Sequence, residues 1–191
     1  NALTMRRALS YASNFDALIV QHALDQDLQS AGVMHEGELA TRLGLTGIPV
    51  AAETAIIDRD IRLVELTGAR YHIQQISSGE SVEAVRQAKA RGLAVSCGVS
   101  AAHLMLNEND VENYRTFAKL NPPLRSEDDR LALVDGLADG TIDIVVSGHN
   151  PQDAEAKRQP FAQAAYGTVG VETLLSVLLS LHTRMAWILQ R

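Results

Sequence analysis

The stretch Gly92-Leu-Ala-Val-Ser-Cys-Gly-Val99 is a short and nearly continuous apolar run. Three further runs of this kind lie before and after it, at Asp16–His22, Ala69–Ser77 and Asp143–His149. Runs of this length and composition are typical of parallel β-strands that are covered on both faces. The sequence therefore predicts four parallel strands at these positions.

Helical patterns separate the four runs. The predicted helices are Leu3–Ala12, Glu36–Arg42, Ala51–Leu66, Ser81–Ala90, Glu127–Leu137 and Val171–Leu181. Gly68 and Gly92 each follow a helical pattern and are predicted C-terminal caps. Ser126 with Asp129 resembles a capping box in which Asp replaces Glu. The alternation of strands and helices indicates an α/β fold with a parallel sheet. Four such units fit a doubly wound sheet and half of a TIM barrel equally well.

Composition limits the classes of protein to which the chain can belong. Its 191 residues, without internal repeats or linkers, predict a single domain over residues 1–191. The net charge of −6 argues against binding to nucleic acid or to an anionic membrane. Cys97 is the one cysteine, so no intramolecular disulfide can form and a cytoplasmic location is expected. The chain starts without Met and has no apolar stretch near the ~20 residues of a membrane span. We expect it to be part of a longer protein.

Polar side chains gather where the predicted strands end. His22 ends the first run, Gln74 and Gln75 follow His72 in the second, and the third leads to His103. The fourth run ends at His149 and continues to Gln152. In both candidate folds the ligand site lies at this edge of the sheet. Histidines that recur at one edge suggest a zinc site, although a single histidine at a strand end often serves only as a structural hydrogen-bonding group.

The segment Lys119–Arg130 precedes a predicted helix. Pro122 and Pro123 stiffen it, and the Asn121 amide offers both a donor and an acceptor. The residues alone leave two interpretations open, a ligand-binding loop or a solvated entry to the helix.

Together these segments resemble dihydroorotase of the long, bacterial and multifunctional-protein type. The phrase Asn121-Pro-Pro-Leu-Arg-Ser-Glu-Asp-Asp-Arg130 is the most specific match. The other matching segments are Asp16–His22, Gly32–Glu38, Ala55–Gly68, Asp139–Ser147, Lys157–Phe161 and Gly167–Thr173. The resemblance covers most of the chain. It implies the C-terminal half of an amidohydrolase (β/α)8 TIM barrel, with the N-terminal strands missing from this chain.

The resemblance also implies a reaction. Dihydroorotases interconvert carbamoyl aspartate and dihydroorotate in pyrimidine synthesis. A zinc-activated water attacks the cyclic amide, and an aspartate at the end of the last strand carries the proton.

The metal and catalytic positions of the family are only partly retained. His22 matches a zinc ligand, whereas Gln75 stands where the family has a second ligand, a histidine. The family phrase Ser-Asp-His-x-Pro-His reads Ser147-Gly-His-Asn-Pro-Gln152 here. The catalytic Asp is thus Gly148, and a substrate-contacting His is Gln152. The family's His-x-His zinc pair is not in the chain.

The substrate positions are better retained. Asn121 matches a substrate-binding Asn, and the segment from Gly167 to Gly170 matches one whose backbone contacts the dihydroorotate ring. His103 lies in a family phrase, but no role is assigned to it. The end of the chain, Thr183–Arg191, departs from the family.

These matches imply a small-molecule substrate, dihydroorotate or carbamoyl aspartate, and a homo-oligomer. We expect zinc to be absent or weakly bound and the activity of this chain alone to be negligible, because Gln75 and Gly148 replace functional groups. The alternative is a noncatalytic, dihydroorotase-like partner of aspartate transcarbamoylase. An intact His-x-His pair elsewhere in the protein would favour an enzyme.

Overall fold

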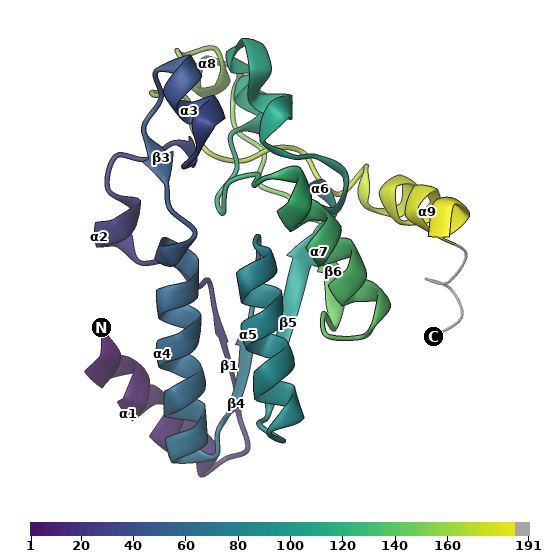
Figure 1. Cartoon of the computed structure of the whole chain (residues 1–191). Coiled ribbons are helices and arrows are strands. Elements are labelled where there is room, and N and C mark those ends of the chain that lie inside the picture. The colour runs from purple at the N-terminus through teal and green to yellow at the C-terminus, as the bar shows by residue number, and fades with distance from the viewer. Residues whose placement is uncertain (186–191) are drawn as a thin grey trace.

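A computed structural model describes residues 1–185 of the chain (Figure 1). Its main sheet has four strands, β1 (Leu18–Gln21), β4 (Arg70–Ile73), β5 (Val95–Ser100) and β6 (Ile144–Val146). The order is β1-β4-β5-β6 and every pairing is parallel. The predicted α/β class, the four strands and their order are confirmed.

The strands are shorter than the predicted runs. β4 ends at Ile73, so the residues from Gln74 to Ser77 leave the sheet and form a loop. Gln74 still donates its N–H to the Gln21 carbonyl oxygen at 2.9 Å, which holds the start of this loop beside the end of β1. The polar ends of the apolar runs thus become the edge at which a ligand can bind.

The sequence did not predict a second, two-stranded parallel sheet. It pairs β2 (Met34–His35) with β3 (Gly47–Ile48). The helix expected at Glu36–Arg42 begins later, because α3 spans Glu38–Leu43. Two-residue strands are too short to produce a periodic pattern, so this part of the sequence could not reveal them.

The longer helices lie close to their predicted positions: α1 (Ala2–Ser13), α4 (Ala51–Thr67), α5 (Gly79–Ala90), α7 (Glu127–Ala138) and α9 (Leu174–Met185). Short ones connect the rest: α2 (Gln26–Gln29), α6 (Ala101–Met105), η1 (Glu108–Tyr114), η2 (Thr116–Ala118) and α8 (Ala154–Lys157). The expected start of the last helix at Val171 is wrong, since α9 begins at Leu174. The departure from the family expected at Thr183–Arg191 lies mainly outside the described residues.

Glycines end two helices as predicted. Gly68 has φ +66° and donates its N–H to the Val64 carbonyl oxygen at 2.8 Å, and Gly92, with φ +76°, follows the last residues of α5. At the start of α7, the Ser126 hydroxyl accepts from the Asp129 N–H at 3.1 Å. The Asp129 carboxylate accepts from the Ser126 hydroxyl and from the Gly79 N–H. Asp129 therefore ties α7 to α5, which the predicted capping box did not include.

The described residues form two separate apolar cores. The larger lies between the sheet and its helices and contains Leu9, Ile57, Tyr71, Val85 and Val99. The smaller consists of buried side chains from the segments that sit above the strand ends in Figure 1: Val33, Met34, Leu39, Ala40, Val111, Ala118, Leu120, Leu124 and Phe161. We call this upper part the lobe. The last helix, α9, contacts α6, and its Leu181 is buried in the larger core.

Candidate functional site

A cavity of about 400 Å³ lies between the carboxyl ends of the strands and the lobe. The ends of all four main strands contribute to its wall, together with the loop at Asn121 and the loop from Tyr166 to Thr168. Its lining residues are His22, Gln74, Gln75, Ser100, Ala102, His103, Leu120, Asn121, Val146, Ser147, Gly148, His149, Asn150, Tyr166, Gly167 and Thr168. This lining contains no Asp, Glu, Lys or Arg. The cavity can therefore bind a ligand through amides, hydroxyls and imidazoles.

The structure brings together most of the site residues predicted from the sequence. His22, Gln75, Asn121, Gly148 and Gly167 all line this one cavity. Gln152 and Gly170 do not line it. Gln152 is exposed, and its amide nitrogen bonds to Asn150 at 3.0 Å.

Gly148 is the position where the resemblance implies a catalytic aspartate. A Cβ added to Gly148 would lie 3.0 Å from the Ser100 Cβ and 3.8 Å from the Gln75 amide nitrogen. The residue has φ +59°, a conformation that Asp and Asn tolerate better than most residues. A carboxylate here would thus face Gln75, but glycine supplies no group that can carry a proton.

His103 lines the cavity and is buried. Its Nε2 is 3.1 Å and 3.3 Å from the carbonyl oxygens of Pro122 and Pro123, which only accept hydrogen bonds. Nε2 therefore carries the hydrogen, and Nδ1 accepts from the Ser100 hydroxyl at 2.7 Å. Burial lowers the pKa of His103, in agreement with a neutral ring.

These contacts give His103 the role that the sequence could not assign. The ring holds the two carbonyls that follow Asn121 and so fixes the loop that presents Asn121 to the cavity. The Asn121 Oδ1 is buried and has no hydrogen-bond partner within the described residues. Because Pro122 lies 19 residues from His103, no local pattern could have revealed the contact.

Two buried lysines support the loop that carries Gly167. The Lys119 Nζ donates to the carbonyl oxygens of Phe161, Ala162 and Ala164 at 2.9, 3.0 and 2.7 Å. The Lys157 Nζ donates to those of Ala165 and Gly167 at 2.8 and 2.7 Å.

No carboxylate within the described residues forms an ion pair with either lysine. Burial lowers the pKa of both groups. The carbonyls of one short loop, from Phe161 to Gly167, surround two ammonium groups.

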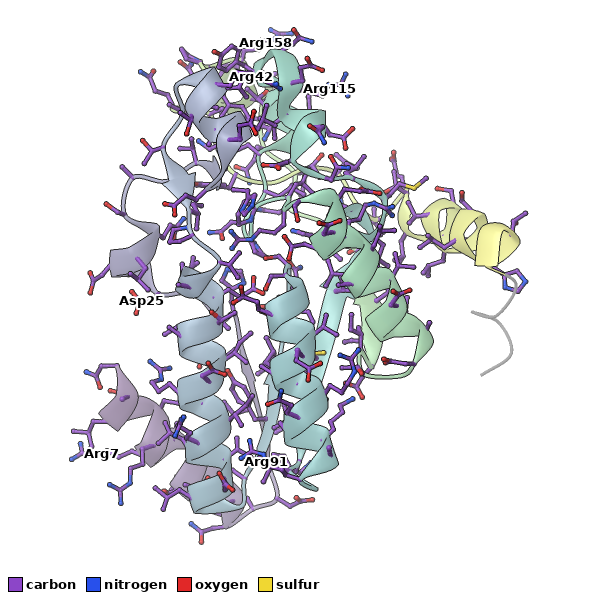
Figure 2. The ribbon with its side chains drawn as sticks, viewed as in Figure 1. Arg7, Asp25, Arg42, Arg91, Arg115 and Arg158 are labelled. Atoms are coloured by element: carbon purple, nitrogen blue, oxygen red, sulfur yellow. The ribbon has the colours of Figure 1, made fainter. Side chains whose placement is uncertain are left out.

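Sequence pattern does not reveal this arrangement, because a lysine in a polar segment is normally solvated. Figure 2 shows the usual case in the neighbouring Arg158, which lies at the outer surface of the lobe together with Arg42 and Arg115. The side chain of Lys157, the residue before Arg158, is buried. The loop that carries Gly167 is therefore held from inside the lobe.

The residues of this chain do not by themselves fit a complete zinc centre. Within residues 1–185, no three or more His, Cys, Asp or Glu side chains are grouped so that they could hold a metal ion. At the matched position His22 shares the cavity with Gln75, and an amide is a poor substitute for imidazole. A catalytic zinc site needs three protein ligands.

Comparisons with known proteins show which family the chain resembles. A family model described as dihydro-orotase-like matches residues 2–81. The dihydroorotase of Ehrlichia chaffeensis is 45% identical over 183 residues, which cover 95% of this chain and 41% of that protein. The dihydroorotase of Anaeromyxobacter dehalogenans (strain 2CP-C) is 50% identical over 179 residues, 93% of this chain and 41% of that protein. The chain belongs to the dihydroorotase-like family. It spans about two fifths of the length of these relatives.

A solved structure decides between the two folds that composition left open. D-hydantoinase from Bacillus sp. AR9 superposes with a TM-score of 0.85 at 22% identity, over 99% of this chain and 44% of that one. The four parallel strands thus have the fold of part of a TIM barrel and not that of a doubly wound sheet. No helix within residues 1–185 is both long and apolar enough to cross a membrane.

Proposed function

We propose that this chain forms the substrate-binding half of a dihydroorotase-family protein of pyrimidine biosynthesis that has lost most of its catalytic power. The ligand is a carboxylated cyclic amide such as dihydroorotate, or carbamoyl aspartate as its ring-opened form. Asn121 and the Gly167 loop support the binding part of the proposal, because both face the cavity. The cytoplasm is the proposed location, since Cys97 is buried and unpaired.

The glycine at position 148 is the observation that supports the proposed loss of catalysis. Hydrolysis of a cyclic amide needs a group that takes a proton from the attacking water and returns it to the leaving nitrogen. Glycine has no such group, and removal of a general base typically costs ~10²–10⁴-fold in rate. Gln75 weakens the metal position beside it, so zinc should be absent or weakly bound.

Restoring the two lost groups tests this proposal in the protein at its natural full length. Gly148→Asp and Gln75→His are made singly and together, and turnover of dihydroorotate is measured with added zinc. Gly148→Asn is the matched control, because it meets Ser100 at the same distance but carries no carboxylate.

We expect turnover to rise only in the double variant. Substantial turnover by Gly148→Asp alone would show that the metal site is intact and that our interpretation of Gln75 is wrong. Turnover by the unmodified protein at a rate usual for enzymes, about 10 s⁻¹, would overturn the proposal as a whole.

A noncatalytic scaffold is the second candidate function, and the same two positions, Gln75 and Gly148, favour it. A protein without turnover could be retained as a partner of aspartate transcarbamoylase. Sedimentation of the two proteins from the same organism, separately and mixed, tests this. A mixture that sediments as two independent species at micromolar concentration would exclude the scaffold.

A further inference from the structure

The ring of His149 is held by two backbone amides. The N–H groups of Gly170 and Val171 point at its Nδ1, at 3.2 and 3.3 Å. A backbone N–H can only donate, so Nδ1 must present its lone pair to them. In a neutral imidazole the other nitrogen then carries the hydrogen. The contacts therefore select the tautomer with hydrogen on Nε2.

The backbone around His149 is built to make this contact. His149 pairs with Thr168 in a parallel bridge, and Asn150 donates its N–H to the Thr168 carbonyl oxygen at 3.0 Å. A Cβ added to Gly170 would lie 2.0 Å from the Ser147 carbonyl oxygen. Only glycine allows the two segments to approach this closely. The N–H of Gly170 is consequently used by His149 and is not free for a ligand.

His149 lines the cavity, and no hydrogen bond within the described residues engages its Nε2. We propose that His149 presents a fixed Nε2–H donor to the cavity, so that the bound ligand places a carbonyl or carboxylate oxygen at this nitrogen. The inference rests on the proposed function, because it takes the cavity as the ligand site. The Asn121 Oδ1, which lacks a partner, is available for an N–H of the same ligand. A cyclic amide offers both groups side by side.

The same geometry excludes two other roles for His149. To bind a metal through Nε2, the ring would have to move its hydrogen to Nδ1, where it would meet two N–H donors. To act as a base at Nε2, the ring would need the same change. His149 therefore cannot replace the proton carrier that is absent from Gly148, although the two residues are adjacent.

The tautomer is measured directly by nitrogen-15 NMR of the protein at its natural full length. His149→Phe identifies the His149 signals in a long-range proton–nitrogen correlation spectrum. We expect the pattern of a neutral ring with hydrogen on Nε2, unchanged when zinc is added. A hydrogen on Nδ1, or the loss of the Nε2–H signal on adding zinc, would overturn the proposal.

A pair of variants then separates the donor from the structural contact. The side-chain oxygen of Asn occupies nearly the place of Nδ1, so His149→Asn retains the acceptor for the amides but has no donor at the place of Nε2. His149→Gln retains a donor near Nε2 and gives up the acceptor. Titration with dihydroorotate in a calorimeter should show about tenfold weaker binding for His149→Asn, as for the loss of one hydrogen bond. His149→Gln should lose less.

The outcomes distinguish this inference from the function on which it rests. Equal affinity of wild type and His149→Asn for dihydroorotate would refute the donor role but would not contradict the proposed function. If the wild type does not bind dihydroorotate although Nε2 carries the hydrogen, both the proposed ligand and the donor role fail. A loss in His149→Gln that exceeds the loss in His149→Asn would show that the contact is only structural.

Discussion

Replacing Lys119 with methionine removes an ammonium group and keeps most of the aliphatic length of the side chain. In the wild type, Lys119 is 2% exposed. Its ammonium group donates to the carbonyl oxygens of Phe161, Ala162 and Ala164. It also lies 4.6 Å from the centre of the Tyr166 ring, which lines the cavity. Methionine can fill the space but cannot donate to the carbonyls.

The size of the effect follows from these contacts. A buried acceptor that loses its partner costs about 1–3 kcal/mol, so three carbonyls set a range of ~3–9 kcal/mol. Part of this is offset, because the variant no longer has to bury a charge and because the loop can turn carbonyls toward water. We expect a net loss of about 3–5 kcal/mol in the free energy of unfolding. A domain typically has only ~5–15 kcal/mol in total.

Urea unfolding at neutral pH measures the loss, with Lys89→Met as the matched control. Lys89 also donates to an acceptor, Asp143, at 2.7 Å, but its side chain is 26% exposed. A partly exposed ion pair of this kind contributes about 0–1 kcal/mol. If Lys119→Met costs no more than Lys89→Met, the carbonyl cage contributes nothing to stability and our account of the loop is wrong.

Two further changes test other parts of the cavity. Burial lowers the pKa of His103 from 6.5, so just below pH 6.5 the imidazole binds a proton in the unfolded chain but not in the folded chain. The free energy of unfolding should therefore fall as the pH decreases from 6.5, by at most ~1.4 kcal/mol per pH unit from this group. Urea unfolding should show a shallower fall in His103→Gln than in the wild type, and equal slopes would refute this. Gly167→Ala would place its Cβ 2.3 Å from the Asn150 carbonyl oxygen at φ +117°, whereas Gly44→Ala, at φ +66°, meets nothing within 4 Å. Thermal unfolding should show a loss of more than ~2 kcal/mol for Gly167→Ala and about 1 kcal/mol for Gly44→Ala, and equal losses would contradict the close packing at Gly167.

The sequence predicted the main sheet well because each strand carries its own signal. An apolar run such as Gly92–Val99 must be covered on both faces, and that requirement alone indicates a buried parallel strand. The lobe has no comparable signal. Its strands are two residues long, and its core is assembled from single residues such as Met34, Val111 and Phe161, which lie far apart in the chain. Local pattern cannot show which of these residues meet.

Part of the candidate site could likewise be predicted from the sequence, and part could not. The placement of His22, Gln75 and Gly148 at one cavity follows from the rule that parallel strands present their carboxyl ends at one edge. Gln152 lies only four residues beyond Gly148, yet the chain has already turned away from the cavity. The role of Lys119 depends on carbonyls more than 40 residues away, which only the folded chain brings together.

The hydrogen-bond partners of the cavity decide what chemistry it can support. Carbonyl oxygens fix the hydrogen of His103 on Nε2, and amide N–H groups fix that of His149 on the same nitrogen. Protonation of His149 at Nδ1 would break its bonds to the two N–H groups, burial disfavours the protonated form of His103, and Gly148 has no side chain. The third imidazole that lines the cavity, His22, has no such contact within the described residues. One such imidazole beside Gln75 can assist binding but cannot both hold a metal and move a proton. We therefore expect catalysis to require changes at both Gln75 and Gly148, since either change alone leaves one of those two tasks without a group.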